Sequence, residues 1–179
     1  MTINRCTCGA RCHEAIKIPW IEPVIFSEFI SWVYGYAILH YVPVDQQSLT
    51  LCKLWVLGAQ LRCLRLQDDV IYFFAENISD LVLLNHGDLP LLPVETIQYV
   101  YTNTNYGNGL RRFLVDYTLY TMDKEVFEQT NFRHYHKDFE MELEVRNAEV
   151  HPKARRWEKL GKLLDGEHLQ TYFVCKDRR

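Results

Sequence analysis

The chain has 179 residues, of which 48% are hydrophobic, 24% charged and 13% aromatic, and its formal net charge is −3. The apolar content is sufficient for a packed core, which excludes a chain that is disordered throughout. The slightly acidic balance predicts no general attraction to nucleic acid or to a membrane surface.

The N-terminal end predicts an intracellular protein. Residues 1–14 lack the apolar run of about 7–15 residues that a signal peptide needs. Polar residues interrupt every apolar stretch well before the ~20 residues that would span a bilayer. We therefore expect a cytoplasmic or nuclear protein without membrane contact, whose six cysteines stay reduced.

The first elements in chain order are a strand, a helix and a second strand. Residues 14–20 alternate in polarity, which predicts a short strand that ends at Pro19. A helix is predicted from Pro23, a favourable first-turn residue, to a C-terminal cap at Gly35. Residues 37–44 are rich in β-forming side chains, which predicts another short strand.

The predicted helix after Pro23 is apolar on most sides and carries one carboxylate, Glu28. We expect Glu28 to lie on a narrow exposed face that it shares with two serines. The rest of the helix must be covered by other elements. We expect Phe29, Trp32 and Val33 to pack against the next two helices, near Leu54 and Phe73.

The next segment predicts a helical hairpin. Its first helix spans about residues 45–61 and is capped by Asp45 or Ser48. The second starts near Gln67, where Asp68 would lie beside the positive end of the helix dipole. The short connection makes the two helices antiparallel neighbours.

A turn-rich stretch at residues 85–93 is the predicted boundary between two parts of the chain, 1–84 and 85–179. The second part predicts a helix over 94–104, a glycine-containing loop and a helix over 110–122. The residues expected to point inward on the last helix are Leu110, Phe113, Leu114 and Tyr117. From Asp123 to Glu149 the chain is acidic and less periodic, and from Lys153 onward it is a charged, partly basic tail.

Two groups of residues raise the hypothesis of a metal site. Cys6, Cys8, Cys12 and His13 cluster near the N-terminus, but their spacing is C-x-C and no second ligand pair follows. His134 and His136 would share a face only on a strand, and the charges around them are typical of a solvated surface. We therefore expect no bound metal and no other cofactor.

The sequence lacks the motifs GxSxG, GxGxxG, GxxxxGK[ST] and HExxH. No nucleophile or acid–base pair stands out in their place, so we expect no enzyme and no small-molecule substrate. The basic tail segment at residues 153–162 is diluted by acidic residues and lacks stacked aromatic residues. Nucleic-acid binding is therefore not expected from it, and a solvated helix face is the simpler interpretation.

The order of strand, apolar helix ending in W-x-Y-G, strand and helical hairpin resembles a BTB/POZ domain, and more narrowly the BTB proteins common in filamentous fungi. The matching segments are HEAIKI, EPVIFSEFISWVYGYAI, LCKLWVLGAQLRCLRLQDDVI and LPVETIQYVYTNTNYGNGLRRFLVDY. They cover roughly residues 13–120. The resemblance implies a predominantly helical α+β chain: a partial BTB/POZ fold over residues 1–84, and a helical extension with a charged tail over 85–179.

The resemblance also shows a departure at the start of the chain. The strands and the helix that open a BTB domain have no counterpart before His13, which implies an N-terminally truncated domain. Their absence would leave strand edges unpaired and apolar surface uncovered. The dimer face of the family uses the same missing elements, which weakens the expectation of self-association.

BTB domains are interaction modules without chemistry of their own. The resemblance implies a protein-binding adaptor, in many members one that brings substrates to cullin-based ubiquitin ligases, or a transcription-related scaffold. In such adaptors a φ-x-E pattern contacts the cullin, and Phe26 and Glu28 fit that pattern as the predicted partner-binding residues. The alternative is a small zinc- or nucleic-acid-binding regulator that uses the cysteine-rich N-terminus and the basic tail.

Overall fold

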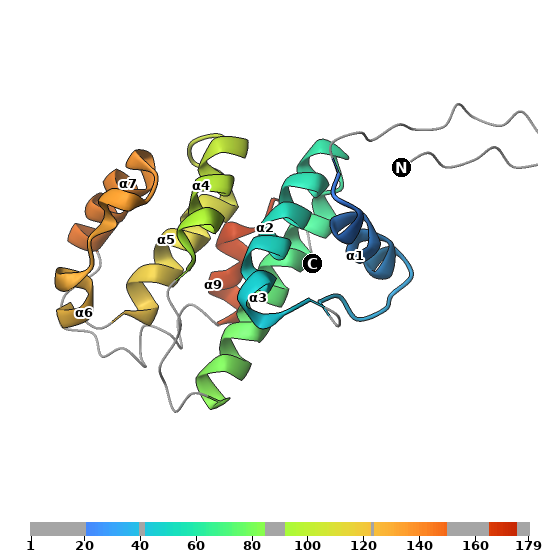
Figure 1. Cartoon of the computed structure of the whole chain (residues 1–179), viewed down its shortest axis with the longest axis horizontal. Helices are drawn as coiled ribbons and strands as arrows, with labels where there is room; N and C mark the ends of the chain where they lie inside the picture. Colours follow the sequence, from blue (N-terminus) through green and yellow to red (C-terminus); the bar gives the residue numbers. More distant parts are fainter. Residues whose placement is uncertain (1–20, 40–41, 85–91, 123, 150–164, 175–179) are drawn as a thin grey trace, which may run out of the picture. The chain divides into compact units, whose positions relative to one another are not determined.

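The computed structural model describes residues 21–39, 42–84, 92–122, 124–149 and 165–174 (Figure 1). These residues are predominantly helical, as predicted, and no strand forms among them. The chain divides into two units, Met1–Tyr41 and Val42–Arg179, each of which is described by itself. The boundary expected within residues 85–93 lies mostly outside the described residues, and that division stays a prediction.

The first unit contains α1 (Pro23–Val33), which begins at the predicted proline. The helix ends in a tight turn in which Gly35 has a φ of +72°. The Gly35 N–H donates to the Trp32 carbonyl at 3.0 Å, and the Tyr36 N–H donates to the Ser31 carbonyl at 2.8 Å. The predicted glycine cap is therefore confirmed, because a residue with a side chain is strained at this φ.

The strand predicted over residues 37–44 is wrong for the part of it that is described. Leu39 has a φ of +64°, which reverses the chain where a strand would stay extended. Its N–H donates to Glu28 Oε2 at 2.7 Å, so a side chain takes the place of a neighbouring strand. The strand expected at residues 14–20 lies outside the described residues.

The second unit opens with a helical hairpin, α2 (Val44–Gln60) and α3 (Leu64–Leu84), drawn side by side in Figure 1. The predicted cap of α2 at Asp45 or Ser48 is wrong: Pro43 precedes the helix and no side chain caps it. The helix α3 starts before Gln67, because only a three-residue turn separates it from α2. Gly58 allows this close turn, since a Cβ there would lie 3.0 Å from Gln67 Cγ.

The next two helices of this unit are α4 (Val94–Asn103) and α5 (Gly109–Thr121), both predicted to within one residue. The four residues expected to point inward from α5 are all buried: Leu110, Phe113, Leu114 and Tyr117. Contacts join α4 to α2 on one side and to α5 on the other. Asn108 caps α5 by accepting a hydrogen bond from the Arg111 N–H at 2.9 Å.

Five further elements complete the described chain: α6 (Lys124–Gln129), η1 (Phe132–His134), α7 (Lys137–Glu149), α9 (Gly166–Leu169) and η2 (Gln170–Tyr172). The sequence did not define α7, because its buried side is formed by two residues, Phe139 and Leu143. Both α7 and η2 pack on α5. Among the described helices, none combines the length and the hydropathy that crossing a membrane requires.

Candidate functional site

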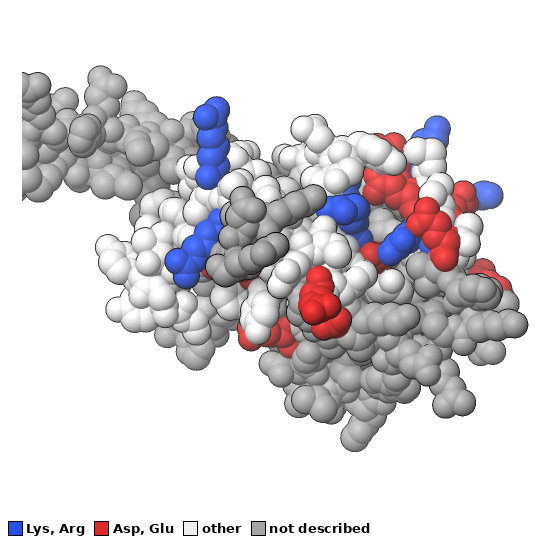
Figure 2. Space-filling view, turned by 180° about the vertical axis from the view of Figure 1, so that it is seen from behind, with Lys and Arg blue, Asp and Glu red and all other residues white. Residues whose placement is uncertain are grey.

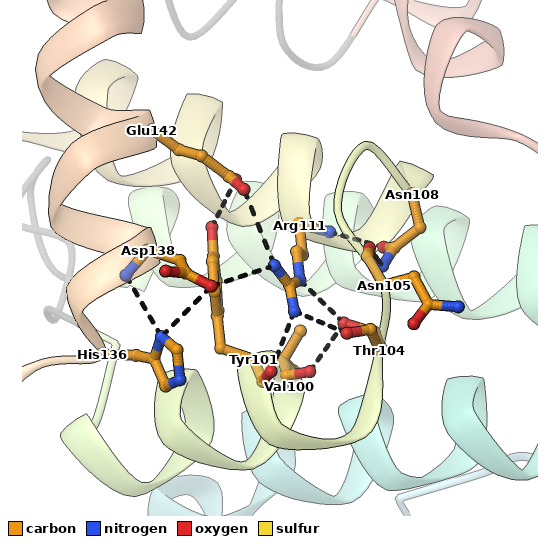
Figure 3. Close-up of polar contacts among 9 residues, drawn as sticks. All are labelled: Val100, Tyr101, Thr104, Asn105, Asn108, Arg111, His136, Asp138 and Glu142. Atoms are coloured by element: carbon orange, nitrogen blue, oxygen red, sulfur yellow. Dashed lines mark hydrogen bonds and ion pairs between the residues drawn. The ribbon is translucent and has the colours of Figure 1, made fainter.

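Arg111, in the first turn of α5, is buried and holds the α4–α5 connection in place (Figure 3). Its Nη2 donates to the carbonyls of Tyr101 at 2.8 Å and Thr104 at 2.5 Å, and its Nε donates to Thr104 Oγ1 at 3.0 Å. These carbonyls lie at the C-terminal end of α4, where helical partners run out. The Arg111 side chain therefore joins the C-terminal end of α4 to the first turn of α5 by hydrogen bonds.

The positive charge of Arg111 is matched by two carboxylates of α7. Its Nη1 lies 3.7 Å from Glu142 Oε1 and 3.9 Å from Asp138 Oδ2, and the guanidinium lies 4.2 Å from the centre of the Tyr101 ring. The Tyr101 hydroxyl donates to Glu142 Oε2 at 2.7 Å. Burial and Glu142 raise the pKa of Tyr101 well above its ordinary value. Ion pairs and hydrogen bonds connect all members of the cluster, although Glu142 Oε1 is buried and accepts no hydrogen bond among the described residues. These mutual contacts indicate a structural role.

Asp116, also on α5, organises a second cluster with α7. Arg146 Nε donates to Asp116 Oδ1 at 2.7 Å and Arg146 Nη2 donates to Oδ2 at 3.3 Å, while Arg146 Nη1 donates to Glu149 Oε2 at 2.9 Å. The hydrogen bond to Asp116 raises the pKa of Arg146. This bidentate ion pair between Arg146 and Asp116 fixes the orientation of α7 on α5.

Tyr172 connects Asp116 to His168. Its hydroxyl donates to Asp116 Oδ2 at 2.6 Å and lies 2.9 Å from His168 Nε2. Burial, followed by the charge of Asp116, raises the pKa of Tyr172 well above its ordinary value, so the hydroxyl keeps its proton. Because that proton is used for Asp116, His168 must donate from Nε2 to the Tyr172 oxygen. Neutral His168 then carries its proton on Nε2 and leaves Nδ1 as an acceptor.

A pocket of about 590 Å³ lies between α5, α7 and the C-terminal segment, residues 165–174. We call it the α7 pocket. Apolar and aromatic side chains line it together with two basic ones: Tyr106, Val115, Met141, Val145, Arg112 and His168. On the side of this unit occupied by α7, Figure 2 shows basic and acidic side chains intermingled, so this surface is neither uniformly positive nor uniformly negative. The pocket therefore combines apolar walls with paired charges.

The C-terminal segment is fixed to the helices by contacts that are far apart in sequence. Arg112 Nη2 donates to the Thr171 carbonyl at 2.9 Å, and the Val174 N–H donates to Asp68 Oδ1 at 2.8 Å. The Tyr172 ring meets the Phe113 ring edge-on at 5.4 Å. Asp68 was predicted at the start of α3, but it lies one turn inside that helix, where it holds this segment instead.

No family model, no curated protein and no solved structure matches this chain. The resemblance to BTB/POZ domains stays a prediction, and the function is inferred from the residues of the chain itself.

The predicted partner-binding residues do not both lie on the surface. Glu28 was expected to be exposed, and this is wrong: it is 6% exposed and accepts the hydrogen bond from the Leu39 N–H. Phe26 is half-buried and lies beside Phe29, with ring centres 6.3 Å apart. Val33 was expected to be covered, and this is wrong, because its side chain is 52% exposed. The expected packing of Phe29 and Trp32 near Leu54 and Phe73 involves both units and stays a prediction.

The residues considered for the alternative, a metal- or nucleic-acid-binding regulator, are mostly outside the described part of the chain. The cluster from Cys6 to His13 and the basic segment at 153–162 lie outside the described residues. His136 lies next to α7, where its Nδ1 accepts from the Asp138 N–H at 3.2 Å, and His134 lies in η1. Within the described ranges, no group of three His, Cys, Asp or Glu side chains is arranged to hold a metal ion.

The sequence did not single out the α7 pocket. Asp116 is 30 residues from Arg146 and 56 residues from Tyr172, so no local pattern connects them. Two signals were nevertheless present. Asp116 interrupts the apolar run of α5, and His168 and Tyr172 have the i,i+4 spacing that brings side chains together on a helix.

Proposed function

We propose that this chain is a protein-interaction module without catalytic activity, and that it binds a partner polypeptide at the α7 pocket. The proposal is carried by one observation: Tyr106, Met141 and Val145 are 80%, 54% and 59% exposed and line the same pocket. Single exposed apolar side chains are ordinary, whereas a group around a pocket is typical of a binding surface.

Two polar groups of the pocket, Asp116 and Arg146, support binding more than catalysis. Asp116 already accepts three hydrogen bonds, from two nitrogens of Arg146 and from Tyr172. Arg146 in turn bonds both Asp116 and Glu149. A catalytic acid or base must exchange a proton with its substrate, and groups saturated in this way hold the walls in position instead.

Photocrosslinking at Met141 tests the proposal. A photoreactive amino acid at residue 141 should give a discrete crosslink to another polypeptide when the full chain is irradiated in cell extract, identified by mass spectrometry. The matched control places the same group at Tyr72 on α3, which has a similar exposure of 51%. Identical crosslinking patterns at the two positions would contradict the proposal.

The finer proposal is an adaptor of the BTB/POZ type for a cullin-based ubiquitin ligase. It is supported by the sequence resemblance and by the helices α1 to α5, which follow in the order of the matching segments. Because Glu28 is engaged by Leu39, Phe26 is the remaining candidate contact on α1. A purified cullin N-terminal domain should bind the full chain saturably and bind Phe26→Ala more weakly. No binding at any attainable concentration would restrict the proposal to a general interaction module.

A further inference from the structure

We infer that the α7 pocket receives the free carboxyl terminus of a partner polypeptide whose last residue is apolar. This inference rests on the proposed function, because it names the part of the partner that the pocket would hold. Such a terminus offers a carboxylate, a backbone N–H and an apolar side chain close together. The pocket presents a matching group for each of the three.

The carboxylate is matched by Arg112. Each acidic residue that lines the pocket already has an arginine: Asp116 and Glu149 pair with Arg146, and Glu142 pairs with Arg111. Among the described residues, no carboxylate forms an ion pair with Arg112. Its Nη2 donates to the Thr171 carbonyl at 2.9 Å, which anchors the side chain beside the pocket. A guanidinium has five N–H donors, so most of them remain for an incoming carboxylate.

The backbone N–H is matched by His168. The Tyr172 oxygen accepts the His168 Nε2 proton, because the Tyr172 hydroxyl donates to Asp116. In neutral His168, Nδ1 is then an acceptor, and among the described residues no donor reaches it. Since His168 lines the pocket, a donor on the ligand would satisfy it.

The apolar side chain is matched by the walls. Val115 is buried on α5, while Met141 and Val145 stand one turn apart on α7. Tyr106, from the loop before α5, adds an aromatic surface. A volume of about 590 Å³ lies within the range of roughly 300–1,000 Å³ typical of ligand pockets, and it exceeds the needs of one residue. Preceding residues of the partner would occupy the remainder.

The test uses the full chain and two probes that differ in one group. The probes are acetylated hexapeptide mixtures with five random positions and a final leucine, one with a free carboxylate and one with a carboxamide. Binding is measured by competition with a fluorescent carboxylate peptide. We expect the carboxylate probe to bind at least about tenfold more tightly, the gain typical of a charge-assisted hydrogen bond.

Variants assign the difference to the named residues. Arg112→Gln should remove the preference for the carboxylate, whereas Arg133→Gln, an exposed arginine on η1 outside the pocket, should keep it. Met141→Gln should weaken both probes, because it puts an uncharged polar group into the apolar wall. Near-wild-type melting temperatures of the variants would exclude loss of folding as the cause.

Four outcomes would overturn the inference. Equal binding of both probes, or no binding of either, removes the carboxyl terminus as the occupant, although a crosslink at Met141 would still support the proposed function. Equally tight competition by acetyl-leucine alone would show that a small carboxylic acid suffices. Absence of the Met141 crosslink contradicts the proposed function itself, so the two failures are distinguishable.

Discussion

Gly109 lies directly against the backbone carbonyl of Tyr172, so closely that a Cβ atom on residue 109 would overlap the carbonyl oxygen. Gly109 is the first residue of α5, and Tyr172 is the last residue of η2. The missing side chain at residue 109 is therefore what allows the C-terminal segment to lie on α5. Because that segment forms one wall of the α7 pocket, this contact also determines whether the pocket exists.

Replacing Gly109 with alanine should displace the C-terminal segment. The added methyl group meets backbone atoms, which cannot move aside as the end of a flexible side chain would. We expect faster amide hydrogen exchange in residues 165–174 and weaker binding at the α7 pocket. Gly107→Ala is the matched control: it is strained by a φ of +76° but has open space around it, so it should destabilise the loop and leave the segment docked. Equal effects of the two changes would contradict this account.

Replacing Tyr172 with phenylalanine should destabilise the protein although the ring contact with Phe113 is kept. The change removes the hydroxyl that donates to Asp116 and accepts from His168. Leaving buried polar partners unsatisfied costs about 1–3 kcal/mol. Urea denaturation measures this loss in the free energy of unfolding. Tyr106→Phe is the control, because that side chain is exposed and its change should be neutral within about 0.5 kcal/mol.

The sequence predicted the helices whose signals are local. Pro23 and Gly35 mark the two ends of α1, and the apolar periodicity of α5 placed its inner residues correctly. Helix α7 was not predicted, since its buried face is limited to Phe139 and Leu143. Helical periodicity is recognised from apolar residues that recur over several turns, and two residues are too few to show it.

The strand prediction and the exposure of Glu28 failed together, for one reason. The β-forming composition after Gly35 favoured an extended chain, but Leu39 adopts a left-handed conformation that Glu28 stabilises from 11 residues away. A tertiary hydrogen bond thus overrode local propensity. The Asp116 cluster could not be predicted for the same kind of reason, because its partners meet only after α7 and the C-terminal segment have packed on α5.

Replacing Arg111 with methionine should be strongly destabilising. The Arg111 side chain is 5% exposed, and its loss leaves Glu142 without its ion-pair partner and the end of α4 without its donors. Breaking one side of a buried pair costs about 3–5 kcal/mol. The double variant Arg111→Met with Glu142→Gln should recover part of this loss, because it removes the isolated charge. Additive effects in chemical denaturation would show that the two side chains are not coupled.

Stability should decrease in alkaline solution because buried tyrosines resist ionisation. Burial raises the pKa of Tyr117 from 10.0 to about 12. Below pH 10 the hydroxyl is protonated in both the folded and the unfolded chain, and its contribution is complete. Between pH 10 and about 12 only the unfolded chain ionises, so the free energy of unfolding falls by up to about 1.4 kcal/mol per pH unit for this group.

Melting temperatures measured from pH 9 to 12 check this decrease. Tyr117→Phe should make the decline less steep, because one proton-linked group is removed. The pKa values of Tyr101 and Tyr172 are also raised, so the decline should persist in that variant. An unchanged slope after the Tyr117 substitution would contradict the assignment to that residue.

Replacing Glu28 with alanine should loosen the turn after α1 without requiring any partner protein. The Leu39 N–H would lose its acceptor at a buried position, and an unsatisfied buried donor costs about 1–3 kcal/mol. Amide hydrogen exchange at Leu39 should accelerate by roughly ten- to a hundredfold, which corresponds to that energy. Glu28→Gln keeps an acceptor oxygen and should preserve most of the protection. If the Leu39 amide exchanges equally fast in Glu28→Gln and Glu28→Ala, the hydrogen bond does not stabilise this turn. A direct role of Glu28 in partner binding would then be the better explanation for this residue.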